Sequence, residues 1–209
     1  MALISALISE LRVDLADEAS TRFTDATLLA VFKKAIRRAN RIVQRNGLQF
    51  GKKKATFNTT ANTGYVVLST VASDFDTFVA MYRTDTGEEI KQVAEWELET
   101  VTKTAGSFYY CYLDYQNDKI LLEDTPASAI ACALYYYPAV DPSAYTVSSS
   151  SPWSGRLDDI IMEYVGIRMK NVDEMDVYFD KSLMQDMKNQ ILLAYAPNQA
   201  TMVEGKGWL

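Results

Sequence analysis

The sequence predicts an α+β fold in which a terminal α-helical bundle carries an inserted β-rich region. Amphipathic helical patterns occupy the two ends of the chain, as an N-terminal helix pair and a C-terminal helix pair. Between them the hydrophobic period changes from 3.6 residues to 2. We expect the helical bundle over 1–53 and 138–196, the inserted β-rich domain over 54–137, and a flexible C-terminal tail over 197–209.

The first two helices are separated by a short polar turn. Residues 3–16 carry one apolar stripe, and residues 17–24 form the turn into a second helix at 24–46. Thr24 is a good N-cap for that helix and Gly47 is a typical stop signal. Because the connection is short, the two helices are expected to be antiparallel neighbours.

The second helix has an apolar face and a basic face, although the chain is acidic as a whole. From Thr24 to Lys54 there are nine basic residues and one acid, a net charge of +8, whereas the full chain carries −6. The basic face can meet acidic residues of a neighbouring subunit, nucleic-acid phosphates or solvent. We expect the first of these and place four arginines at a subunit interface: Arg37, Arg38, Arg41 and Arg45.

The middle of the chain consists of short runs that alternate between apolar and polar residues. We expect a short helix at 95–102, and strands at 55–59, 65–69, 77–83, 88–93, 108–115, 119–123 and 129–137. Turn signals at 62–64 and 85–87 predict two hairpins, and the last three strands are expected to form a meander. The last strand is apolar on both faces. It is therefore either central in the sheet or in contact with another subunit.

Two more helices are expected at 157–170 and 174–196, and they are too apolar for simple surface helices. A helix that is apolar around most of its circumference is either deeply buried or wedged between two bodies. Methionines suit both situations, because the side chain adapts to irregular surfaces. We assign four methionines to the subunit interface: Met162, Met169, Met184 and Met187.

The composition excludes many kinds of chemistry. There is no histidine, which rules out Ser-His-Asp and Cys-His catalysis and histidine-ligated zinc. Cys111 and Cys132 lie in apolar strand patterns and are expected to be free buried thiols. Acidic residues at 158–159 and 173–176 are explained by the helix starts that they occupy. We therefore expect no catalytic residue, metal, cofactor or membrane span, and no enzymatic activity.

Three features of the sequence resemble one known family. Arg22-Phe23-Thr24-Asp25, followed by Leu28 and Leu29, matches the R-[WF]-[ST]-D-x-x-L-L turn of the head-to-tail adaptors of tailed bacteriophages. The strand end Leu134–Pro142 and the helix after it are similar to the corresponding part of that family, as are the final helix pair and loose tail. The resemblance covers 1–46 and 129–196.

The resemblance implies a structural virion protein without enzymatic activity, made in the host cytoplasm. Such adaptors form a homo-oligomeric ring, usually of about twelve copies, that is docked on the portal protein and carries the downstream tail protein. Double-stranded DNA would pass through the lumen without sequence recognition.

Other functions are compatible with the same residues. The chain can be another tail component, such as a nozzle, tube or minor capsid protein. It can also be a sugar-binding module that uses its strand tyrosines, or a hydrolase that depends on carboxylates. Copy number separates these classes, because only the virion parts require a large ring.

The C-terminal tail is the predicted contact with the portal. Pro197 ends the last helix, and the residues after it have too little apolar surface to fold alone. Trp208 either folds back on its own domain or anchors the tail on a neighbouring protein. We expect the second and assign four residues to a portal-binding tail: Pro197, Met202, Trp208 and Leu209.

Overall fold

The computed structural model describes residues 2–102, 106–171 and 177–195. The chain divides into two compact units. Residues Met1–Phe50 and Val140–Leu209 belong to a helical unit, and Gly51–Ala139 form a β unit. The chain thus leaves the helical unit once and returns to it once.

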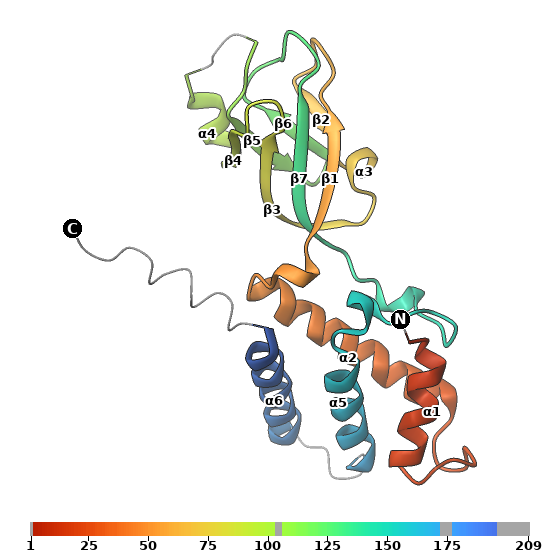
Figure 1. The fold of residues 1–209 in the computed structure, drawn as a ribbon. Coiled ribbons are helices and arrows are strands. Elements are labelled where there is room, and N and C mark those ends of the chain that lie inside the picture. The colour runs from red at the N-terminus through yellow and green to blue at the C-terminus, as the bar shows by residue number, and fades with distance from the viewer. Residues whose placement is uncertain (1, 103–105, 172–176, 196–209) are drawn as a thin grey trace, which may run out of the picture. The chain divides into compact units, whose positions relative to one another are not determined.

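Four long helices build the helical unit: α1 (Ile4–Asp14), α2 (Asp25–Arg45), α5 (Asp158–Lys170) and α6 (Val177–Tyr195). Helix α5 lies between α1 and α6 and also contacts α2, as Figure 1 shows. Their apolar stripes face inward and form one core. This core includes Ile4, Leu7, Leu11, Leu28, Phe32, Ile36, Tyr164, Val165, Leu183, Met187 and Ile191.

The segment that precedes α5 closes over the start of α1. It contains the short 3₁₀ helices η2 (Pro142–Ala144) and η3 (Pro152–Gly155). The backbone N–H of Ile4 donates to Ser149 O at 2.9 Å, and that of Ser151 donates to Ala2 O at 3.1 Å. The first of these bonds satisfies a backbone N–H at the start of α1 that a helix leaves free.

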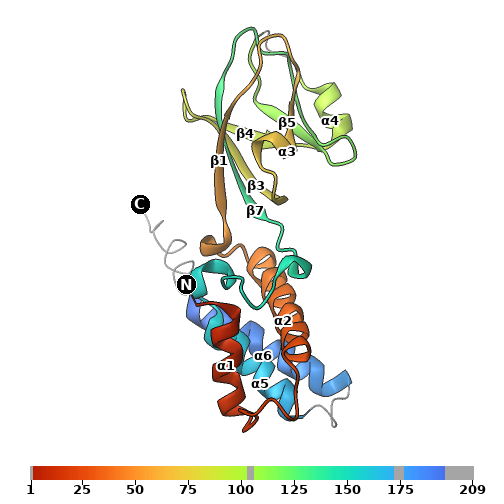
Figure 2. The ribbon, with the colours of Figure 1, turned by 90° about the vertical axis from the view of Figure 1, so that its right-hand side faces the viewer.

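The β unit contains one sheet with strand order β1-β7-β3-β4-β5-β6-β2. The sheet curls around its own core in both views of Figures 1 and 2. Neighbouring strands are antiparallel except β4 and β5, which are parallel. The strands are β1 (Lys53–Asn58), β2 (Tyr65–Val67), β3 (Phe75–Arg83), β4 (Glu89–Gln92), β5 (Tyr110–Asp114), β6 (Lys119–Leu122) and β7 (Ala131–Pro138).

Strand β7 lies between β1 and β3, so both of its edges are paired. Cys132, Leu134 and Tyr136 point into the core of the β unit, together with Phe108 from the segment before β5. On the other face of β7, Tyr137 is also buried. The strand is interior to the sheet, next to the edge strand β1.

The predicted fold class, a terminal helical bundle with an inserted β-rich region, is wrong. The six α-helices of the described residues are scattered along the chain, and the curled sheet is the strand-rich core. Helices α3 (Leu68–Val71) and α4 (Glu95–Thr100) lie among the strands. The strand expected at 65–69 ends at Val67, because α3 begins at Leu68 and its turn buries Leu68 in the β core.

Some strand pairings also differ from the prediction. The hairpins β3–β4 and β5–β6 are confirmed. The expected hairpin at 62–64 is wrong, because β1 pairs with β7 and β2 pairs with β6. The expected meander of the last three strands stops at β6, because β7 pairs with β1 and β3 and not with β6. A turn signal reports a local reversal of the chain, whereas these pairings join strands far apart in sequence.

Candidate functional site

Helix α2 presents its basic face to the outside of the helical unit. The hydroxyl of Thr24 accepts a hydrogen bond from the N–H of Thr27 at 3.2 Å and so caps the helix. The apolar stripe from Leu28 to Val43 is buried. Arg37, Arg41 and Arg45 are exposed, and Arg38 is half-buried. The periodicity of the sequence therefore sets which residues are available for contact.

Arg38 is held inside the helical unit by Asp180 of α6. Its guanidinium donates to both carboxylate oxygens, at 2.9 and 2.6 Å. Arg168 of α5 donates to the same carboxylate, and Arg38 lies 5.4 Å from the ring centre of Tyr164. Burial opposes ionisation of Asp180, but hydrogen bonds from both arginines lower its pKa below the usual value. Asp180 thus joins three helices.

A groove of about 370 Å³ runs between α2 and α6. Arg41 and Arg45 line one side, and Met184 and Lys188 line the other. Within the described parts of the chain, none of the three cations makes an ion pair. Met184 leaves 40% of its surface exposed beside them. We call this surface, with Arg38, Ile42, Asn46 and Gln185, the basic groove.

A second groove, of about 330 Å³, lies between α1 and α5. It is lined by three carboxylates, Asp14, Asp159 and Glu163, and by Lys170. The side chains of Met162 and Ile167 and the backbone of Gly166 complete the lining. We call this surface the acidic groove. Sequence reasoning did not find it, because Asp14 lies far from α5 in the sequence.

The turn between α1 and α2 is built on a buried ion pair. Arg12 donates to Asp17 at 2.9 Å and to Asp25 at 2.6 Å. Asp17 also accepts from the backbone N–H groups of Arg22 and Phe23, at 2.8 and 2.9 Å. The bond from Arg22 is the main reason why the pKa of Asp17 is lowered, against the effect of burial. The Arg-Phe-Thr-Asp motif is therefore wrapped around one carboxylate.

Sequence reasoning missed Arg12 and Asp17. A signal for Arg12 was present, since it lies four residues after Ile8 on the apolar stripe of α1. A cation at such a position needs an acidic partner nearby. Asp17 was the nearest acid in the polar turn that follows the helix.

The family model for the SU10 adaptor protein matches residues 3–201 of this chain. The chain belongs to the SU10 adaptor protein family. No curated protein matches the sequence. The family is one of phage head-to-tail adaptors, so the resemblance seen in the Arg-Phe-Thr-Asp motif is confirmed. The chain is accordingly a phage adaptor and a structural component of the virion.

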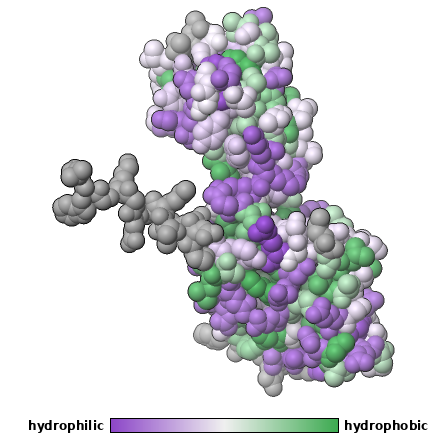
Figure 3. Space-filling view, viewed as in Figure 1, coloured by the Kyte–Doolittle hydropathy of each residue, from purple (hydrophilic) through white to green (hydrophobic). Residues whose placement is uncertain are grey.

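The four methionines assigned to an interface occupy different environments in this adaptor. Met162, Met169 and Met187 are buried within the helical unit, where they fill its core. Met184 is exposed in the basic groove. In the view of Figure 3, green apolar residues lie among purple polar ones on the helical unit, so isolated apolar side chains are available there.

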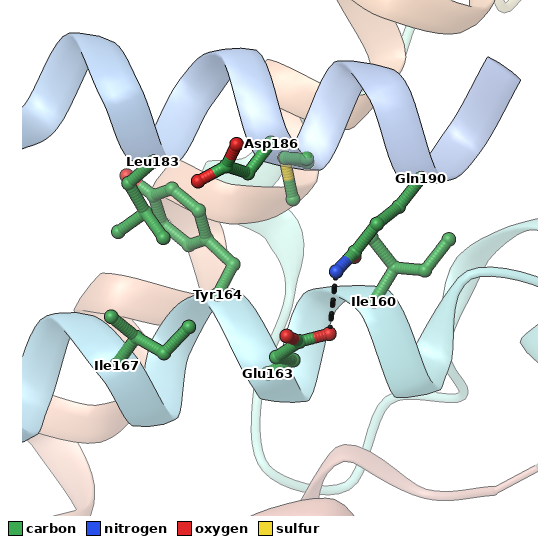
Figure 4. Close-up of a pocket in the computed structure, with 8 residues that line it drawn as sticks. Ile160, Glu163, Tyr164, Ile167, Leu183, Asp186 and Gln190 are labelled. Atoms are coloured by element: carbon green, nitrogen blue, oxygen red, sulfur yellow. Dashed lines mark hydrogen bonds between the residues drawn. The ribbon is translucent and has the colours of Figure 1, made fainter. Parts of the chain in front are cut away.

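Figure 4 shows a smaller crevice of about 130 Å³ between α5 and α6. Gln190 donates to Glu163 there at 2.8 Å, and Ile160, Ile167 and Leu183 supply apolar walls. Asp186 lies on the α6 side. Glu163 thus faces the crevice and also lines the acidic groove.

The remaining candidate residues of the adaptor have structural surroundings. Burial raises the pKa of Cys111 to about 12 and that of Cys132 to about 11, so both thiols stay protonated. Tyr135 packs edge-on against Tyr82 with ring centres 5.9 Å apart, and Tyr136 is buried. These tyrosines contribute to packing of the sheet.

Some features lie beyond the described part of the chain. The four residues assigned to the portal-binding tail, Pro197, Met202, Trp208 and Leu209, are outside it. Among the residues that the structure does describe, no group of His, Cys, Asp and Glu side chains is arranged to hold a metal ion. No described helix is long and apolar enough to cross a membrane.

Proposed function

We propose that this adaptor forms a homo-oligomeric ring of about twelve copies between the portal and the downstream tail protein. Membership of the adaptor family carries the proposal, because a head-to-tail adaptor has to contact proteins of the head and of the tail. Double-stranded DNA passes through the lumen of the ring without sequence recognition.

The distribution of charge supports contacts between copies. Residues 24–54 carry +8 in a chain of net charge −6. Arg37, Arg41 and Arg45 project from α2 without an ion pair among the described residues, so they are free to meet acids of a neighbouring copy. Arg38 already has an ion pair with Asp180 of its own chain. Its role in the contact is therefore indirect: the pair fixes α6 against α2.

The acidic balance also suits passage of DNA. A cationic lumen would release counterions from the phosphates and retain the duplex. A chain with a net charge of −6 offers enough acidic residues to line the lumen once its basic surface is covered by a neighbour. One ring can thus use its basic surface for contacts between copies and its acidic residues to line the lumen.

The ring is tested by the mass of the purified protein. One copy has a mass of 23.5 kDa, so a twelve-membered ring has about 280 kDa. Mass photometry, alone and with added portal protein, should show a closed species near this value, and negative-stain images should show a central hole. A protein that stays monomeric under both conditions contradicts the proposal.

We propose further that the C-terminal tail binds the portal through Trp208. A tryptophan at an interface typically contributes about 2 kcal/mol or more to binding. Deletion of 198–209 should abolish binding to the portal in pull-down assays and leave the thermal midpoint unchanged. The substitution Trp208→Ala is the matched milder change. Unaltered portal binding by the truncated chain would exclude this role.

A further inference from the structure

The helical unit carries two grooves of opposite charge on different helix pairs. The basic groove lies between α2 and α6, and the acidic groove lies between α1 and α5. Helix α5 separates α1 from α6 (Figure 1). We propose that the surface around the basic groove of one adaptor copy packs against the surface around the acidic groove of the next copy. The inference rests on the proposed ring and names the two surfaces that close it.

The basic groove has unused binding capacity. Asp180 already neutralises Arg38, yet Arg41, Arg45 and Lys188 have no acidic partner in the described residues. Three unpaired cations around one groove repel one another, and bringing carboxylates between them removes that repulsion. The exposed side chain of Met184 provides an adaptable apolar contact in the same groove.

The acidic groove has the matching chemistry. Asp14, Asp159 and Glu163 make no ion pair among the residues described, and Lys170 is the single cation in the lining. Val13, next to Asp14, exposes 61% of its surface. Each surface therefore carries mainly charges of one sign and has one exposed apolar side chain in it or next to it.

A second copy of the chain is the partner that fits the basic groove, because each copy also carries the oppositely charged surface. A contact between two different surfaces of identical chains leaves each copy with one free surface of each kind. Further copies then add in the same direction until the ring closes. A symmetric dimer through either groove alone would place like charges together, which costs binding energy.

Charge reversal tests this contact. The variant Arg41→Glu/Arg45→Glu has acidic residues on both surfaces, and Asp14→Lys/Glu163→Lys has basic residues on both. Each variant alone should associate at least tenfold more weakly than the wild type, because like charges now meet. An equimolar mixture of the two should form alternating rings. The four substitutions combined in one chain should also restore the ring.

A matched control separates the groove from the general charge of α2. The variant Lys33→Glu/Lys34→Glu makes the same change of net charge on the same helix, outside the groove and away from the arginines assigned to the interface. It should assemble like the wild type. Circular dichroism and the thermal midpoint of every variant show that the helical unit is folded.

The outcomes distinguish this contact from the ring itself. If the wild type forms rings and both charge-reversed variants do too, the contact is wrong while the proposed function stands. If the wild type forms no ring, the proposed function fails. If Arg41→Glu/Arg45→Glu keeps the ring but no longer binds a 30-base-pair duplex that the wild type binds, the groove is a phosphate site and the contact is overturned.

Discussion

Replacing Arg12 with methionine is expected to lower the free energy of unfolding of the helical unit by about 3 kcal/mol. The methionine keeps most of the side-chain volume of Arg12 but leaves Asp17 without its cation. Asp17 is only 3% exposed, so water cannot take the place of the guanidinium. The second partner of Arg12, Asp25, is mostly exposed, so water can solvate its carboxylate and the loss of this ion pair costs much less stability.

Thermal and urea unfolding followed by circular dichroism measure this loss. Arg22→Met is the matched control, since Arg22 belongs to the same turn but is exposed and lies 4.9 Å from the ring centre of Phe23. It should cost less than about 1 kcal/mol. Equal losses for the two variants would show that the buried ion pair does not hold the turn.

The sequence was sufficient where the structure depends on local patterns. The apolar stripe of α2 is strong because its buried residues recur with the helical period over 21 residues, and Thr24 caps it as expected. Most strands also begin and end within a few residues of their predicted ends. Local periodicity and turn chemistry are sufficient to place such elements.

The sequence was insufficient where the structure depends on contacts between residues that are far apart in the chain. The pairing of β1 with β7 joins Lys53 to Tyr136, and no turn signal connects them. The acidic groove likewise combines Asp14 of α1 with residues of α5. The burial of Met162 and Met169, and the partner of Arg38, depend on which helices are neighbours. Periodicity gives the face of a helix but not the helix that covers it.

The second large effect is expected at Asp180. Asp180→Asn preserves the size of the side chain but leaves Arg38 and Arg168 as two close, partly buried cations without a counterion. The loss of two charge-assisted hydrogen bonds is expected to lower the free energy of unfolding by about 2 kcal/mol. Asp186→Asn, at an exposed position of the same helix, is the control and should change stability by less than about 0.5 kcal/mol.

The same ion pairs make the stability depend on pH. The pKa of Asp180 is lower in the folded protein than in the unfolded chain, so its contribution is present at neutral pH. It is lost as the pH falls below about 4 and passes through the folded pKa. The wild type should therefore lose more stability than Asp180→Asn between about pH 5 and pH 2. Parallel curves for the two proteins would contradict this.

Asp180 also connects stability to assembly. Its bond to Arg38 fastens α6 to α2, and these two helices form the walls of the basic groove. If the ring closes through that groove, Asp180→Asn should weaken association at neutral pH even where the helices stay folded, because the groove widens and gains an unpaired cation. Mass photometry at 25 °C, well below the thermal midpoint, measures this. A variant that is less stable but assembles fully would separate the ion pair from the interface.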